Sequence, residues 1–97
     1  MPLRVVFRPQ AEDEAIQAHD WYESRRGGLG REFGQALDRL VARITSNPLA
    51  FPRVYGEIRR ATFARFPYAV YFRVADETVV VLAIHGRRDP ARWLRRR

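Results

Sequence analysis

The chain has 97 residues, of which 18 are arginine, 11 are aspartate or glutamate, and none is lysine or cysteine, so its formal net charge is +7. This length predicts one domain over residues 1–97, and the missing cysteines exclude a disulfide scaffold and a thiolate zinc site. No stretch resembles a signal peptide and no apolar run could span a bilayer, so together with the missing cysteines we expect a cytoplasmic protein. The positive net charge predicts an acidic partner, either nucleic acid or an acidic protein segment.

The first half of the chain predicts one strand followed by two helices. Residues 3–7 read as a short strand, and a helix is expected from about Pro9 to Ser24. Gly27-Gly28 breaks that helix. From Leu29 onward, apolar residues recur at three- and four-residue steps until Asn47-Pro48, which is the pattern of a second helix. The two helices are therefore expected to form a hairpin.

The second half opens with a segment that predicts a loop and a strand. Residues 48–56 contain two prolines and a glycine, and we expect an ordered loop with Phe51 and Tyr55 as its anchors in the core. Residues 57–63 alternate in the manner of a strand with one solvent-exposed face.

Two further strands are predicted to form an antiparallel hairpin. Residues 65–74 and 78–84 are dense in β-branched and aromatic residues, and Ala75-Asp76-Glu77 between them has the chemistry of a turn. The run from Val79 to Ile84 is apolar without alternation, which predicts a central strand covered on both faces. A short helical turn is expected at residues 91–94. The predicted fold is α+β, with the order β-α-α-β-β-β and a helical hairpin packed on a mostly antiparallel four-stranded sheet.

Short motifs in this order resemble a known family over nearly the whole chain. They are Trp21-Tyr22-Glu23, Leu29-Gly30-x-x-Phe33, Asn47-Pro48, Ile58-Arg59-Arg60, Arg65-Phe66-Pro67-Tyr68 and His85-Gly86-Arg87-Arg88-Asp89-Pro90-x-x-Trp93. Together they resemble the RelE/ParE toxin superfamily of bacterial type II toxin–antitoxin modules. The resemblance implies one of two activities on this fold: RelE-like members cleave mRNA in the ribosomal A site, and ParE-like members inhibit DNA gyrase.

A RelE-like ribonuclease needs a base for the 2′-hydroxyl, an acid for the leaving oxygen and cations for the phosphate. By resemblance, Arg65 and Arg88 match family arginines that could supply the cations, and His85 could carry a proton because its ordinary pKa lies near neutrality. A histidine at the end of an apolar strand also fits a purely structural role as a cap on the core. The sequence lacks lysine, and Trp93-Leu94 stands where ribosome-dependent members can carry a tyrosine.

The incomplete acid–base set favours a ParE-like gyrase inhibitor with no catalytic residue, no cofactor and no metal. Its candidate target-binding residues are the arginines of the sheet and its exit, although a solvated basic face would have the same composition: Arg59, Arg60, Arg65, Arg87, Arg88 and Arg92.

Either activity implies a hetero-oligomer with a cognate antitoxin, expected to be ParD-like with an acidic C-terminal segment. An amphipathic segment of such a partner needs an apolar groove with cationic edges. The candidate antitoxin-binding residues are the aromatic side chains Trp21, Tyr22, Phe33 and Trp93. We do not expect a membrane among its partners.

Overall fold

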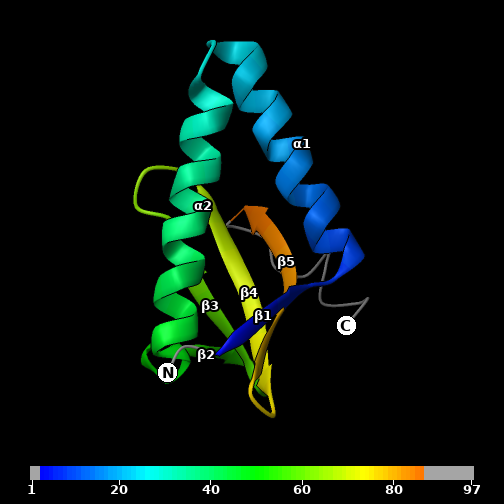
Figure 1. Cartoon of the computed structure of the whole chain (residues 1–97), viewed down its shortest axis with the longest axis vertical. Helices are drawn as coiled ribbons and strands as arrows, with labels where there is room; N and C mark the ends of the chain where they lie inside the picture. Colours follow the sequence, from blue (N-terminus) through cyan, green and yellow to red (C-terminus); the bar gives the residue numbers. More distant parts are fainter. Residues whose placement is uncertain (1–2, 87–97) are drawn as a thin grey trace.

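The computed structural model describes residues 3–86, which form two helices on one face of a five-stranded sheet (Figure 1). The elements in chain order are β1 (Arg4–Phe7), α1 (Pro9–Arg25), α2 (Leu29–Ser46), the 3₁₀ turn η1 (Pro48–Ala50), β2 (Arg53–Tyr55), β3 (Ile58–Thr62), β4 (Tyr68–Ala75) and β5 (Thr78–Gly86). The α+β class and the helical hairpin predicted from the sequence are confirmed. The helical turn predicted at residues 91–94 lies outside the described residues.

The sheet has the order β1-β5-β4-β3-β2, so β5 lies between β1 and β4. β1 runs parallel to β5, with Val5 opposite Val79, and all other pairs are antiparallel. β4 and β5 are joined through Asp76, which has a φ of 57°. An aspartate tolerates this left-handed conformation in a tight turn better than a β-branched residue does. The predicted hairpin and the predicted central strand are both confirmed.

The predicted four strands are five in the structure, because β2 lies inside the segment expected to be a loop. β2 has only three residues, all exposed, and it pairs with β3 through Arg53 opposite Arg59. An exposed strand of this length has no hydrophobic alternation, so only its pairing partner reveals it. Phe51 packs against the core as predicted, but Tyr55 does not: it is 49% exposed on β2. The prediction for Tyr55 was wrong because β2 is the outer strand of the sheet.

Hydrophobic clusters cover both faces of the sheet. On the helix side, Phe33 of α2 is the centre of an aromatic group: the rings of Tyr22, Phe63, Phe66 and Tyr68 lie 5.1–5.7 Å from its own. Such centroid distances are favourable for offset and edge-to-face ring contacts. The opposite face carries a smaller buried cluster composed of Ile58, Ala69, Tyr71, Leu82 and Ala83.

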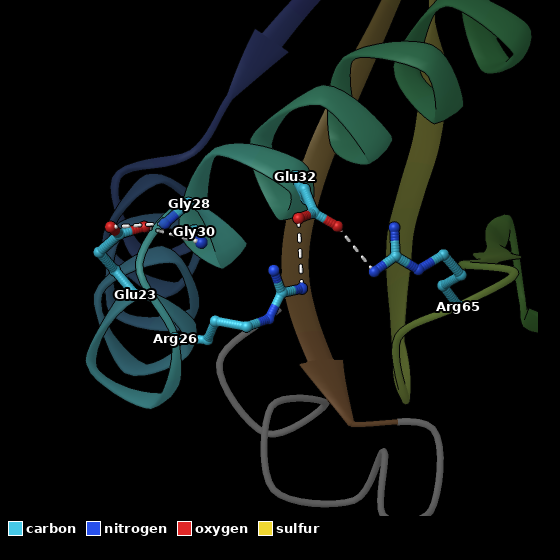
Figure 2. A network of polar contacts seen from close by, with 6 residues as sticks. All are labelled: Glu23, Arg26, Gly28, Gly30, Glu32 and Arg65. Carbon is cyan, nitrogen blue, oxygen red and sulfur yellow. Dashed lines mark hydrogen bonds and ion pairs between the residues drawn. The ribbon is translucent and has the colours of Figure 1, made fainter.

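A carboxylate of α1 caps the start of α2, as Figure 2 shows. Gly28 precedes α2 with a φ of 90°, and its missing side chain leaves the first N–H groups of the helix without a local cap. Glu23 accepts hydrogen bonds from the backbone N–H of Gly28 at 2.9 Å and of Gly30 at 3.0 Å. A negative charge here also complements the positive end of the helix dipole. These bonds hold the pKa of Glu23 below its usual value.

Candidate functional site

Two concave surfaces lie on opposite sides of the helical hairpin. The first, which we call the α1 cleft, has a volume of about 680 Å³ and is lined by Glu14, Gln17, Ala18, Trp21, Tyr22, Pro67, Tyr68, Ile84, His85 and Gly86. The second, the α2 groove, has a volume of about 590 Å³ and is lined by Ala36, Arg39, Leu40, Arg43, Phe51, Pro52, Arg60, Thr62, Phe63, Ala64 and Arg65. The two surfaces share no lining residue. The α1 cleft is lined by Glu14 and His85, whereas the charged residues that line the α2 groove are all arginines.

The α1 cleft contains the histidine that the ribonuclease alternative requires. His85 follows Ile84 near the end of β5, and the backbone N–H of Ile84 donates a hydrogen bond of 3.0 Å to Oε1 of Glu14. The other carboxylate oxygen, Oε2, lies 3.7 Å from Nε2 of His85. Glu14 thus fixes α1 to β5 and places a carboxylate beside the imidazole. The sequence analysis did not single out Glu14; its only signal is an acidic residue on the helix expected to cover the sheet.

Two tyrosines complete the polar wall of the α1 cleft. Tyr22 is 8% exposed, and burial together with the neighbouring Tyr68 raises the pKa of Tyr22 above its usual value. A raised pKa keeps the hydroxyl protonated and neutral at physiological pH. Tyr22 can therefore donate a hydrogen bond there, but it offers no negative charge for acid–base chemistry.

Arg65 lines the α2 groove, whereas His85 lines the α1 cleft. Its guanidinium donates a hydrogen bond of 2.9 Å to Glu32 of α2 and lies 5.1 Å from the centre of the Phe66 ring. Glu32 also pairs with Arg26 at 3.2 Å, so one carboxylate bridges two arginines (Figure 2). The hydrogen bond from Arg65 is the main reason that the pKa of Glu32 lies below its usual value. In the structure Arg65 is thus paired with Glu32 and His85 lies beside Glu14, and Arg88 lies outside the described residues.

Of the remaining candidate target-binding arginines, Arg59 has a structural role and Arg60 lines a surface groove. Arg59 lies opposite Phe72 in the sheet and donates a hydrogen bond of 2.6 Å to the carbonyl oxygen of Phe51, so it holds the η1–β2 segment against β3. Arg60 lies opposite Tyr71 and lines the α2 groove. Arg87, Arg88 and Arg92 lie outside the described residues.

The candidate antitoxin-binding aromatic residues include both buried and exposed side chains. Tyr22 and Phe33 are 8% and 1% exposed in the aromatic core, which gives them a packing role. Trp21 is 50% exposed, and the guanidinium of Arg25 lies 4.3 Å from the centre of its ring. Trp93 lies outside the described residues. Trp21 is thus the exposed member of this set in the part of the chain that the structure describes.

Sequence reasoning missed the α2 groove. Arg39 and Arg43 are four residues apart, and the sequence analysis did not single them out. Residues four apart lie on the same side of a helix, and this spacing was the available signal. The aromatic floor that they flank comes from Phe51 and Phe63 of later segments.

Within residues 3–86, no cluster of histidine, aspartate and glutamate could hold a metal ion. Neither helix in this range is long and apolar enough to cross a membrane.

A family model and a similar protein that match this chain are both described as ParE toxins. Residues 5–90 match the model of a family described as the ParE toxin of the type II toxin–antitoxin system parDE. A protein named toxin ParE2 from Mycobacterium tuberculosis is 28% identical over 92 residues, which cover 93% of this chain and 88% of the relative.

Two solved structures have similar folds. One is of the chromosomal ParDE toxin–antitoxin system from P. aeruginosa, with a TM-score of 0.77 at 18% identity over 87% of this chain and 95% of that one. The other is of the RelBE2 toxin–antitoxin complex from M. tuberculosis, with a TM-score of 0.64 at 19% identity over 90% of this chain and 100% of that one. The chain therefore shares its fold with both of these structures.

Proposed function

The chain belongs to the ParE toxin family of type II toxin–antitoxin systems, and from that premise we propose that it inhibits DNA gyrase and is neutralised by a cognate antitoxin. The proposed toxin acts by binding, as an inhibitor that makes and breaks no covalent bond. We place this activity in the bacterial cytoplasm, where both gyrase and the antitoxin would meet it.

The different partners of His85 and Arg65 are the observation that carries this choice of target: His85 lies beside Glu14, and Arg65 is paired with Glu32. Cleavage of RNA through its own 2′-hydroxyl requires a proton carrier and phosphate-binding cations within reach of one phosphate. Here the histidine lines the α1 cleft, whereas Arg65 lines the α2 groove and is paired with Glu32. Inhibition by surface binding needs no such constellation, so the described residues fit it better.

The RelE-like alternative rests on two observations. The carboxylate of Glu14 beside His85 has the arrangement of an acid–base pair, and the fold also resembles that of the RelBE2 complex. In this alternative His85 would carry the proton, and Arg65 and Arg88 would bind the phosphate. It remains the second candidate because Arg65 lies at the other surface.

The deciding experiment is a pair of assays on one preparation of the full chain. We expect the protein to inhibit supercoiling of relaxed plasmid by gyrase, and to leave ribosome-bound mRNA intact when its ends are mapped by primer extension. Codon-spaced cleavage of mRNA without gyrase inhibition would select the ribonuclease alternative.

The antitoxin is tested in the same system. The full-length protein encoded beside this chain is co-expressed with it, and we expect growth to recover and the two proteins to co-elute as one complex. A neighbouring protein that neither restores growth nor binds would contradict the proposed toxin–antitoxin pairing.

A further inference from the structure

β5 extends beyond its neighbour on one side. β1 pairs with β5 only as far as Val81, whereas β5 continues to Gly86 and pairs with β4 along its other side. Leu82 is an extra residue of β5, at the point where the register with β4 shifts. Such a bulge bends a strand and often marks the place where its pairing changes. Within residues 3–86, no strand pairs with residues 82–86 of β5 on the β1 side.

α1 lies beside this part of β5 (Figure 1). The backbone N–H of Ile84 points toward the helix and donates its 3.0 Å hydrogen bond to Glu14, a side-chain acceptor where a neighbouring strand would present a carbonyl oxygen. Ile84, His85 and Gly86 line the α1 cleft, so this edge of β5 forms one wall of the cleft. A strand edge that faces a cleft is a template on which an extended segment can pair.

The side chains of the cleft select the charge of such a segment. Glu14 is the acidic residue of the described lining, which contains no arginine. The rings of Trp21 and Tyr68 line the same cleft, and Trp21 is half exposed. A carboxylate beside aromatic rings favours a cationic side chain, through charge and through cation–π attraction. Three more exposed carboxylates belong to α1, the helix that walls the cleft: Glu12, Asp13 and Asp20.

We propose that the α1 cleft binds an extended basic segment of DNA gyrase. The backbone of the segment pairs with the edge of β5 from Ile84 to Gly86, and one of its arginine or lysine side chains lies between Glu14 and the rings of Trp21 and Tyr68. This inference rests on the proposed function, because it names the surface by which the toxin binds its target. It also differs from the sequence prediction, which placed the target on arginines of the sheet and its exit.

The α2 groove is the less suitable surface for a basic segment. Its charged lining residues are all arginines, which would repel a further positive charge. Nucleic acid is the less suitable occupant of the α1 cleft, because phosphate binding is electrostatic and the described lining offers no arginine for it. The strand edge and the charge of the cleft thus select the same class of partner.

The first test measures where gyrase covers the chain. Because the chain has no cysteine, Gln17→Cys in the α1 cleft and Gln35→Cys on α2 each give a single thiol at an exposed position. Maleimide modification of the full chain is followed by mass spectrometry, with and without purified gyrase. At a gyrase concentration of about 10 Kd we expect Gln17→Cys to react about 10-fold more slowly, and Gln35→Cys to change by less than about 2-fold. Unchanged reactivity of Gln17→Cys in the complex overturns the proposal.

The second test separates charge from simple coverage. Gln17→Arg adds a cation to the cleft, Gln17→Glu adds a carboxylate at the same position, and Gln35→Arg adds a cation outside the cleft. We expect Gln17→Arg to bind gyrase at least about 10-fold more weakly than the parent at low salt, Gln17→Glu to bind at least as tightly as the parent, and Gln35→Arg to bind within about 2-fold of it. Circular dichroism checks that each variant is folded. Equal losses in Gln17→Arg and Gln17→Glu overturn the proposal.

Three further outcomes have distinct meanings. Equally slow reaction of Gln17→Cys in the free chain would mean that the chain itself or a second copy covers the cleft, which overturns the inference. Stronger protection of Gln17→Cys by the neutralising protein, or by a single-stranded DNA 20-mer, than by gyrase would assign the cleft to that partner and overturn it as well. If the parent chain neither binds gyrase nor inhibits supercoiling, the proposed function itself fails, and that failure is seen before any cleft variant is made.

Discussion

Glu23 in the last turn of α1 accepts a hydrogen bond of 3.0 Å from the backbone N–H of Gly30 in the first turn of α2. The same glycine lies where the two helices approach each other closely: a Cβ at position 30 would stand 2.7 Å from the carbonyl oxygen of His19. The hydrogen bond from Gly30 to Glu23 and the absence of a side chain at Gly30 therefore both hold the end of α1 against the start of α2. Residues of these two helices line the α1 cleft and the α2 groove.

Gly30→Ala is expected to destabilise the protein. Its new Cβ would also lie 2.9 Å from Oε1 of Glu23, so either the helices separate or the cap breaks. We expect the free energy of unfolding to fall by about 1–3 kcal/mol, as in other overpacked interiors, measured by urea denaturation. Gly34→Ala is the matched control, since nothing lies within 4 Å of a Cβ there and the substitution should stabilise α2 by about 1 kcal/mol. Similar losses at both positions would contradict a close approach at Gly30.

Glu23→Gln is expected to remove a pH-dependent part of the stability. Because the hydrogen bonds from Gly28 and Gly30 lower the pKa of Glu23 in the folded state, its carboxylate stabilises the fold above the unfolded pKa of about 4.3. That contribution is lost as the pH falls through the lower, folded pKa. The melting temperature of the variant should therefore lie below that of the parent at pH 7 and approach it in acid.

The control for this measurement is Glu57→Gln, which alters an exposed carboxylate that pairs with Arg53 at 3.5 Å on the surface. Its melting temperature should differ little from the parent across the same pH range, because exposed ion pairs contribute little. A Glu23→Gln difference that does not vary with pH would mean that charge has no part in this cap.

Phe33→Ala and Trp21→Ala should separate packing from surface roles among the predicted antitoxin-binding aromatics. Phe33 is buried at the centre of the aromatic core, so its truncation should cost about 3–5 kcal/mol of unfolding free energy. Trp21 is half exposed, and its truncation should cost clearly less. Thermal unfolding followed by circular dichroism checks both values. Any loss of antitoxin binding by a folded Trp21→Ala variant would then report a direct contact.

His85→Gln tests the choice between the two activities. If the toxin acts on gyrase by binding, the variant should keep the parent's inhibition of supercoiling, since no proton transfer is involved. His19→Gln, on the exposed face of α1, is the matched control for loss of a histidine. Loss of toxicity in His85→Gln alone, with an unchanged melting temperature, would favour the ribonuclease alternative.

Much of the fold was predictable because its signals are local. The three- and four-residue steps after Leu29 encode α2, and the unbroken apolar run from Val79 to Ile84 encodes a strand that is covered on both faces. β2 was not predictable, because three exposed residues carry no period and acquire strand geometry only by pairing with β3. The site residues were harder still, since a residue type indicates possible chemistry but not its neighbours.

The sequence by itself determined the helical hairpin, the central strand, the basic charge and the family resemblance, because each depends on residue identity and on spacing over a few positions. Only the tertiary structure decided that His85 meets Glu14 while Arg65 meets Glu32, that Arg59 is tied to Phe51, and that Tyr22 and Phe33 are packed inside. It also assembled the α2 groove from α2, the η1–β2 connection and β3. Such contacts join residues far apart in the chain, and their geometry is set by how the helices and sheet pack together.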